Sequence, residues 1–414
     1  MYSASDFKLV WKKSELILPN QQQDAFLLVM SKIFQYSCWF GVSGYGKPVW
    51  RLWTLTLIIL LIFIEGEAIW KVVKALAGWA VDTAGHRSVA ARFAGTIFYS
   101  ISIISVILCS RLAHSWRGLS KYWASVERAV AINIPEDVNL KRRLIIIIAG
   151  MAICTFLEHL LNAVSLVGFD SPPSEIMKRY ILLSHGFMIL EWEYSEWYVI
   201  PLIYLSIIAT ILWTFHDLLI ILISIGLTSR YYRLNKYVHH VCEIENKGIK
   251  RSRDPDRKYA VKIHTWRKIR EAYVKQALLV RKMDDQLGGM IVLSSFCNFY
   301  FICLQLFMGI THGKSSTLRR IYFFASLGWL CLRVSGVVLA AADINVRSKA
   351  ALKYIYNCDA NVYNVEVERL QGQLSKDYVA LSGMGFFTLN RNILLQMASS
   401  IITYELVLIQ FDSS

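Results

Sequence analysis

The sequence lacks the residue patterns that are typical of enzymes and metal-binding proteins. Its eight cysteines form no C-x-x-C pair and lie scattered through apolar blocks and basic loops, which argues against a zinc site or a disulfide framework. The nine histidines are equally dispersed. No nucleophile–base arrangement and no carboxylate pair points to catalysis. We therefore expect neither an enzyme nor a resident metal.

Signals for secretion, glycosylation and nucleotide binding are also missing. The apolar stretch 25–30 is too short to be a span and follows a run of glutamines, so we expect no signal peptide. No N-x-[ST] acceptor occurs. The segment 41–48 has the glycines and the lysine of a phosphate-binding loop, but Pro48 stands where that loop needs a hydroxyl group, and a hydrophobic span follows it. We therefore expect no cofactor.

Hydrophobic residues, in contrast, are present in excess and in long blocks. They make up 55% of the chain, above the roughly 45–50% of soluble domains. Each block is about as long as the ~20 residues that a helix needs to cross a membrane. A lipid-exposed backbone must satisfy its own hydrogen bonds, and the alternation of a β-barrel is absent, which predicts an all-α membrane protein. The seven predicted transmembrane helices are 52–70, 93–112, 144–167, 197–227, 287–311, 321–342 and 393–411.

The distribution of Lys and Arg predicts the orientation of these spans. The basic residues concentrate in the N-terminal segment and in alternate loops, at 113–143, 228–286 and 343–392. The other loops carry far fewer. The positive-inside rule therefore predicts a cytoplasmic N-terminus and, with seven spans, an extracellular C-terminus. The net charge of +15 is attributed to cytoplasmic loops, so we expect no nucleic-acid partner.

This orientation decides between classes of membrane protein. A G-protein-coupled receptor has the reverse polarity, and neither D-R-Y after the third span nor N-P-x-x-Y at the end of the last occurs here. A secondary transporter, the less favoured alternative, often shows inverted repeats with broken helices, and the sequence has no such repeat.

The spans divide the chain into six segments. Within 228–286, apolar residues at intervals of three and four predict helices that extend the neighbouring spans into the cytoplasm, with a loop from Lys247 to Lys258 that contains Gly248 and Pro255. The segments are a cytoplasmic N-terminus (1–51), four spans forming the ligand-pocket bundle (52–227), cytoplasmic extensions (228–286), two further spans (287–342), a cytoplasmic helical segment (343–392), and the last span with a short outer tail (393–414).

Polar side chains inside the predicted spans are the candidate ligand contacts, because such groups are costly in a membrane and tend to face cavities. Carboxylates, amides and aromatic faces in an outward-opening pocket suit a neutral polyol. For Glu158, Asp217 and the nearby Arg333, structural pairing between helices is an equally good explanation, and aromatic residues near span ends often anchor at the interface. The candidates are Glu158, His159, Asn162, Tyr204, Trp213, Asp217, Asn298, Gln305 and Trp329.

The end of the chain carries a more specific signal. Residues 403–411 read TYELVLIQF, which resembles the T-Y-h-h-h-h-x-Q-F signature that closes insect gustatory receptors. Glu405 stands where that pattern is more often apolar, and the form T-Y-E-h-h-L-I-Q-F found here resembles the sugar-receptor branch. Residues 380–391 are similar to the family's segment that enters the last helix. Length, number of spans and inverted topology fit this family along the whole chain.

The resemblance implies the insect chemoreceptor channel architecture: a homotetrameric, ligand-gated, non-selective cation channel in the plasma membrane, surrounded by lipid. It implies one pocket per subunit, opened here by a sugar, and four copies of the last helix around the path of the permeant cations. Related receptors are possible co-subunits. A receptor of the same fold tuned to a bitter or other tastant is the alternative.

The last span also has the pattern of a pore wall. Thr403, Val407 and Gln410 follow one another at intervals of four and three along one stripe, with Phe411 beside it. A ring of such side chains narrows a pore enough to close it by dewetting. The alternative is that Thr403 and Gln410 form hydrogen bonds between helices. The loop 168–196 has five acidic residues, and we expect it to form a negative vestibule that favours cations.

Overall fold

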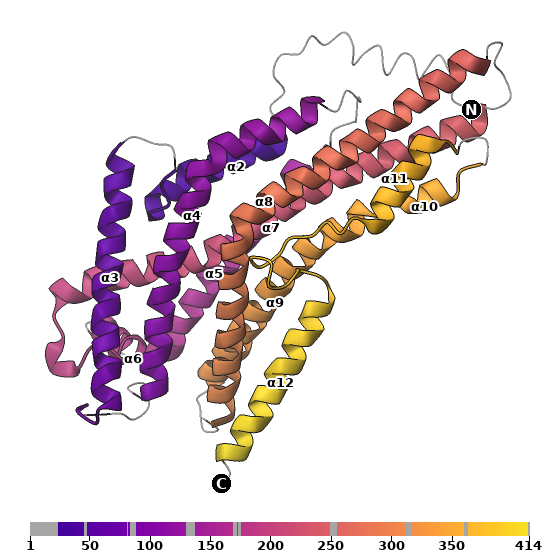
Figure 1. Cartoon of the computed structure of the whole chain (residues 1–414). Helices are drawn as coiled ribbons and strands as arrows, with labels where there is room; N and C mark the ends of the chain where they lie inside the picture. Colours follow the sequence, from indigo (N-terminus) through magenta and orange to yellow (C-terminus); the bar gives the residue numbers. More distant parts are fainter. Residues whose placement is uncertain are drawn as a thin grey trace.

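The computed structural model describes residues 24–44, 48–80, 82, 88–129, 137–168, 172, 175–248, 255–311, 317–359 and 363–412. Within these ranges the chain consists of helices joined by turns, and its one β-bridge pairs Ser382 with Thr388 (Figure 1). The helices are α2 (Ala25–Tyr36), η1 (Ser37–Phe40), α3 (Pro48–Leu76), α4 (Val89–Ala129), α5 (Leu140–Val167), α6 (Ile176–Ser184), η3 (Glu191–Glu193), α7 (Glu196–Gly248), α8 (Pro255–Thr311), α9 (Thr317–Ser348), α10 (Leu352–Tyr356), α11 (Val365–Lys376) and α12 (Asn392–Asp412).

Six described helices, α3, α4, α5, α7, α8 and α9, are long and apolar enough to cross a membrane. They contain the first six predicted spans. The seventh predicted span lies in α12, whose 21 residues match the roughly 20 that a crossing needs. The prediction of an all-helical membrane protein is thus confirmed.

Two of these helices are much longer than a membrane is thick. Helix α7 has 53 residues and α8 has 57. At 1.5 Å per residue each is about 80 Å long, against roughly 30 Å of hydrocarbon. Their distal parts run side by side beyond the rest of the bundle, with α10 and α11 next to them (Figure 1). The loop predicted at 247–258 is too long at both ends, because α7 continues to Gly248 and α8 begins at Pro255. Pro255 stands in the first turn of α8, where its missing N–H costs no helical hydrogen bond.

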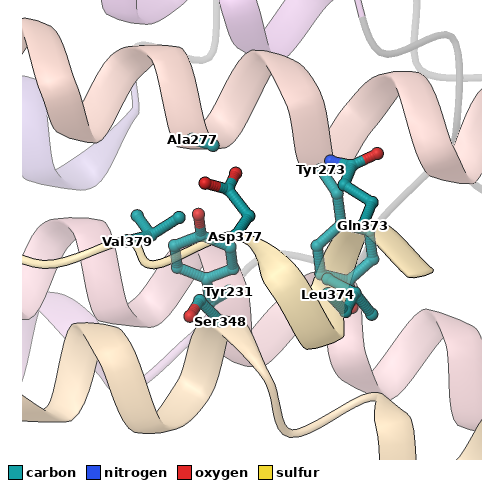
Figure 2. Close-up of a pocket in the computed structure, with 8 residues that line it drawn as sticks. All are labelled: Tyr231, Tyr273, Ala277, Ser348, Gln373, Leu374, Asp377 and Val379. Carbon is teal, nitrogen blue, oxygen red and sulfur yellow. The ribbon is translucent and has the colours of Figure 1, made fainter. Parts of the chain in front are cut away.

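The distal parts of α7 and α8 are held together by a packed interior with charge pairs at its rim. Trp266 is fully buried, and its indole N–H lies 3.2 Å from both carboxylate oxygens of Glu245. The phenol of Tyr273 donates to Asn235 Oδ1 at 2.6 Å. A cavity of about 10 Å³, room for a single water molecule, lies where α11 ends, and Tyr231, Tyr273 and Asp377 are among the residues that line it (Figure 2).

A tight hairpin leads from α11 into α12 and rests on α8. Ser382 donates to the Asp284 carboxylate through its backbone N–H at 2.5 Å and its hydroxyl at 2.8 Å. A Cβ on Gly288 would lie 3.0 Å from the Met384 backbone nitrogen, so this glycine allows the hairpin to approach the helix. Gly385 turns the chain at a φ of +80°. The start of α12 is thereby fixed to α8.

Candidate ligand-binding site

A cluster of buried polar side chains joins α7, α8 and α9 in the middle of the bundle. Asp217 of α7 is completely buried, and its Oδ2 lies 2.9 Å from Nε of Arg333 on α9. Arg333 donates through Nη2 to Asn298 Oδ1 of α8 at 2.7 Å. The Asn298 amide donates back to Asp217 Oδ2 at 3.3 Å. A buried charge is tolerable only when it is paired and hydrogen-bonded, and these three residues meet that condition together.

Further contacts extend the cluster to α4. The hydroxyl of Ser294 donates to Asp217 Oδ1, and His216 Nε2 lies 3.2 Å from the same oxygen. Ser105 of α4 lies 3.0 Å from the other ring nitrogen of His216. Four helices therefore share one network. Replacing any member leaves a buried polar group without its partner, which is costly. The intact network therefore fixes the relative positions of these helices.

Aromatic rings border the cluster on one side. The Arg333 guanidinium stacks over the Trp213 indole at 4.3 Å from the ring centroid, a cation–π contact that is strong when water is excluded. Trp213 in turn packs against Phe301 with ring centroids 4.7 Å apart. The indole N–H of Trp213 is buried and has no hydrogen-bond partner among the described residues.

A second polar group lies between α5, α8 and α9. Ser326 of α9 donates to Glu158 Oε1 of α5 at 2.9 Å and accepts from the Gln305 amide of α8 at 2.9 Å. The Gln305 carbonyl oxygen Oε1 is buried and, within the part of the chain that the structure describes, accepts no hydrogen bond. An orphaned buried donor on Trp213 and an orphaned acceptor on Gln305 are what a hydroxylated ligand or an ordered water would satisfy.

The structure brings five of the nine candidate ligand residues into these two groups: Glu158, Trp213, Asp217, Asn298 and Gln305. For the charged residues, the sequence left open a ligand contact or a structural pair between helices, and the structure contains an arrangement that suits each. Asp217 and Arg333 pair between helices, whereas Glu158 accepts a hydrogen bond from a neutral serine.

The other four candidates lie elsewhere. His159 lines an apolar groove of about 500 Å³ between α2, η1, α5 and α7. Tyr204 is 47% exposed, and its ring is directed to Trp53 of α3 at 6.5 Å. Trp329 is half-buried against the apolar core, and Asn162 is half-buried on α5.

The serines of the two groups were not among the sequence candidates, because isolated serines inside apolar blocks are common. Helical spacing does carry a signal for them. Ser294, Asn298 and Gln305 are separated by four and seven residues and so share one face of α8, and Ser326 and Arg333 are seven apart on α9. A search for polar stripes, rather than for single charges, would have found these residues.

Helix α12 stands apart from the polar groups and packs along α8 and α9 (Figure 1). Leu395, Ile402 and Leu406 are exposed, so an apolar face of this helix is uncovered in the single chain. Of the predicted pore residues, Thr403 is exposed and its hydroxyl donates to Ser399 O of its own helix at 2.9 Å. The side chains of Val407, Gln410 and Phe411 lie outside the described residues.

Two acidic residues of the loop 168–196 form ion pairs with lysines. Glu193 is paired with Lys71 at 2.9 Å, and Glu191 with Lys178 at 3.1 Å. Both charges are thereby neutralised. Helix α6, which is part of this loop, lies on the side of the bundle away from α12 (Figure 1). Two of the five acidic residues are thus paired with lysines, and a negative vestibule formed by this loop stays a prediction.

Comparison with known proteins shows which family this helical bundle belongs to. The family model of the trehalose receptor matches residues 68–414. This chain belongs to the trehalose receptor family. It is 28% identical over 394 residues to gustatory receptor 5a for trehalose of Drosophila melanogaster, covering 92% of this chain and 83% of that one. It is 30% identical over 337 residues to gustatory receptor for sugar taste 64a of the same fly, covering 78% and 70%.

These relatives confirm the branch that the terminal motif indicated: the chain is an insect gustatory receptor of the sugar-receptor branch, a multi-pass plasma-membrane protein and not an enzyme. The fold is that of insect olfactory receptor OR5 from Machilis hrabei, with a TM-score of 0.66 at 12% identity over 94% of this chain and 100% of that one. The structure of that receptor in complex with eugenol superimposes with a TM-score of 0.67 over 93% and 99%.

Proposed function

We propose that this trehalose receptor family member is a subunit of a sugar-gated, non-selective cation channel. The observation that carries the proposal is the pair of polar groups in the bundle, with the unpartnered Trp213 N–H and Gln305 Oε1, in a chain whose relatives are named for trehalose and for sugar taste. A sugar offers hydroxyl groups that both donate and accept, together with an apolar C–H face for the indole ring.

In this proposal the two polar groups have different tasks. Asp217 and Arg333 use their hydrogen bonds on each other and on Asn298, so they position the helices around the pocket. Glu158, Trp213 and Gln305 keep hydrogen-bonding capacity for the ligand. His159, Asn162, Tyr204 and Trp329 remain proposed contacts for a larger ligand or for another conformation.

In this proposal, the sugar opens the channel by shifting the equilibrium between a closed and an open state. The sugar must bind the open state of the pocket more tightly than the closed state, because equal affinity moves no equilibrium. Neutral hydroxyl groups exchange water for protein at a small net gain, so we expect millimolar affinity, about −4 kcal/mol per site. In a homotetramer, the small free-energy preferences of four equivalent pockets for the open state add up.

A mechanical route from pocket to pore is present in one subunit. Helix α8 carries Asn298 and Gln305 in the bundle and Asp284 at the hairpin that leads into α12. A shift of α8 on ligand binding therefore moves the start of α12. We propose that four α12 helices surround the pore, with their uncovered apolar faces packed against partner subunits and with Thr403, Val407, Gln410 and Phe411 along the ion path. The N-terminus is then cytoplasmic and the C-terminus extracellular.

Whole-cell recording of the receptor expressed alone, under a panel of sugars and bitter compounds, tests this proposal. We expect an inward cation current with at least one sugar and none with the bitter compounds. In Glu158→Ala the sugar concentration for half-maximal current should rise about tenfold or more, since one charged hydrogen-bonding group of the pocket is gone. A current evoked only by a bitter compound would overturn the sugar assignment and keep the channel. Unchanged sensitivity of Glu158→Ala would show that the pocket is misplaced.

A further inference from the structure

A second cavity, of about 220 Å³, lies at the end of the bundle where α3 ends and α4 begins, beneath the segment that follows α6. None of the nine candidate ligand residues lines it. Its wall includes the ammonium groups of Lys71 and Lys74, the Glu193 carboxylate and the indoles of Trp79 and Trp192. In the proposed orientation this end faces the outside of the cell.

Buried contacts give the cavity a fixed frame. Arg92 of α4 is 4% exposed and donates to three backbone carbonyls from three segments, those of Lys71 at 3.4 Å, Phe187 at 3.3 Å and Asp82 at 3.0 Å. A Cβ on Gly95 would lie 2.2 Å from the Phe187 ring, so this glycine lets the ring close on α4. The loop that forms the roof is thereby attached at several points to α3 and α4.

Two charged groups of the wall, Glu193 and Lys71, are held in place and neutralise each other. Both carboxylate oxygens of Glu193 lie 2.9 Å from Lys71 Nζ, and the Leu190 N–H donates to the same carboxylate at 3.0 Å. Burial alone would raise the pKa of Glu193, but the Leu190 amide and the Lys71 ammonium outweigh it and hold that pKa below its usual value. Oε2 accepts from both Lys71 and Leu190, whereas Oε1 accepts from Lys71, so Oε1 remains an acceptor for a ligand.

Two indole rings border this polar wall although they contact water. Trp79 and Trp192 are each 68% exposed. Single exposed aromatic residues are common, but two of them at the mouth of one polar cavity form faces that cover the C–H side of a sugar ring. The cavity is smaller than the roughly 300–1,000 Å³ of sites for drug-sized ligands, which suits one pyranose ring.

We propose that this cavity is a second carbohydrate site, which holds one ring of a neutral sugar between Trp79 and Trp192 with its hydroxyl groups on Glu193 and the two lysines. The site rests on the proposed function and orientation. An anion such as a lipid phosphate is less suited, because Lys71 is already paired with Glu193 and the Arg92 guanidinium already donates to backbone carbonyls. A sugar held here occupies the outer end of α3 and α4, and its binding raises the sensitivity of the channel.

The test uses the full-length receptor and two readouts. Trehalose, sucrose and glucose are titrated against the intrinsic tryptophan fluorescence of the receptor in neutral nanodiscs, and against whole-cell current. For the double variant Trp79→Ala with Trp192→Ala we expect loss of a saturable fluorescence component and a threefold to tenfold rise in the half-maximal sugar concentration, at unchanged surface expression and maximal current, as expected for removal of about one aromatic contact. Trp79→Phe with Trp192→Phe should restore sensitivity.

The matched control is Trp197→Ala, which removes an indole that is 91% exposed at the start of α7 and does not line the cavity. It should behave as the wild type. An equal shift in this control, or identical titrations for wild type and double variant, overturns the second site while sugar gating stands. If no sugar evokes current, the proposed function fails, and the fluorescence titration still decides whether the cavity binds sugar. A change that appears only with anionic lipid would assign the cavity to lipid headgroups and overturn the proposal.

Discussion

The polar residues of the transmembrane bundle and those of the distal parts of α7 and α8 are arranged on opposite plans. In the bundle, the side chains of Asp217 and Arg333 are 0% and 3% exposed, and the two residues come from different helices, α7 and α9. In the distal part, Glu366 is buried, but it is held by Arg270 at 2.8 Å and by Arg369 at 3.0 Å, whose side chains are 27% and 61% exposed. Water can replace the partly exposed arginine partners of Glu366, but it cannot replace the buried partners of Asp217 and Arg333.

This difference shows which ion pairs determine how the helices pack against one another. A buried ion pair in low dielectric adds little net stability, yet removing one partner is costly because the other charge is left without compensation. A pair at the rim is screened by salt and water and is worth little either way. The bundle network therefore sets how the helices fit around the pocket, and the distal pairs only adjust an interface that apolar residues already define.

The largest effect is expected for the bundle. Asp217→Ala should lower the free energy of unfolding by about 3–5 kcal/mol, because Arg333 then remains buried without its counter-charge. Thermal unfolding of the purified receptor in detergent measures this loss. Arg347→Ala on α9, the helix of Arg333, is the control, since the Arg347 side chain is 44% exposed, forms an ion pair with Asp343 one turn away and lies 5.9 Å from the centre of the Tyr232 ring. Equal melting of the two variants would contradict the contrast between bundle and rim.

A double variant with leucine at positions 217 and 333 is a second test of the contrast between bundle and rim. Replacing a buried pair with apolar residues is often neutral or stabilising, so the double variant should be more stable than Asp217→Ala. Its sugar response should nevertheless be impaired, because Asn298 loses its partners in the cluster. A double variant with normal sensitivity would show that the network has no part in positioning the pocket.

The hairpin before α12 should give an intermediate effect. Asp284→Ala removes two hydrogen bonds to Ser382, about 1–3 kcal/mol in total, and frees the start of α12 from α8. We expect near-normal surface expression with a changed basal current and a weaker coupling of sugar to current. Asp285→Ala, at the exposed neighbouring position, is the control. Identical gating in both variants would exclude this route from pocket to pore.

The smallest effect is expected at the rim, and it depends on pH. The hydrogen bond from Arg270, together with the charges of Arg270 and Arg369, holds the pKa of Glu366 below its usual value. A depressed acid pKa contributes stability that is present above the unfolded-state pKa and is lost as the pH falls through the folded-state pKa. Melting curves on the acid side should therefore drop less steeply for Glu366→Gln than for the wild type. Parallel curves would mean that the pair contributes nothing.

Much of this architecture is predictable from the sequence, for a physical reason. A hydrophobic block of about 20 residues has few alternatives to a spanning helix, and a charge inside it must find a partner, so Asp217 and Arg333 stand out without a structure. The rotation of each helix is not encoded so simply. His159 follows Glu158 directly, yet it faces an apolar groove while Glu158 bonds to Ser326, because neighbouring residues on a helix point about 100° apart.

The second cavity lies beyond such predictions. Its residues come from the end of α3, the start of α4 and the segment after α6, and only the fold brings Trp79 and Trp192 to one opening. As isolated residues near span ends, both indoles are indistinguishable from interface anchors. The specific information in the sequence was instead the motif of residues 403–411, which identified the family although the side chains at its end lie outside the described residues.

Single-channel recording of the purified receptor in planar bilayers, with sugar added on the side of the C-terminus, tests the central claim most directly. The account predicts unitary cation currents whose open probability rises with sugar at millimolar concentration, and a shift of this dependence to higher concentration in Gln305→Ala with unchanged conductance. Sugar flux across the bilayer without unitary currents would contradict it.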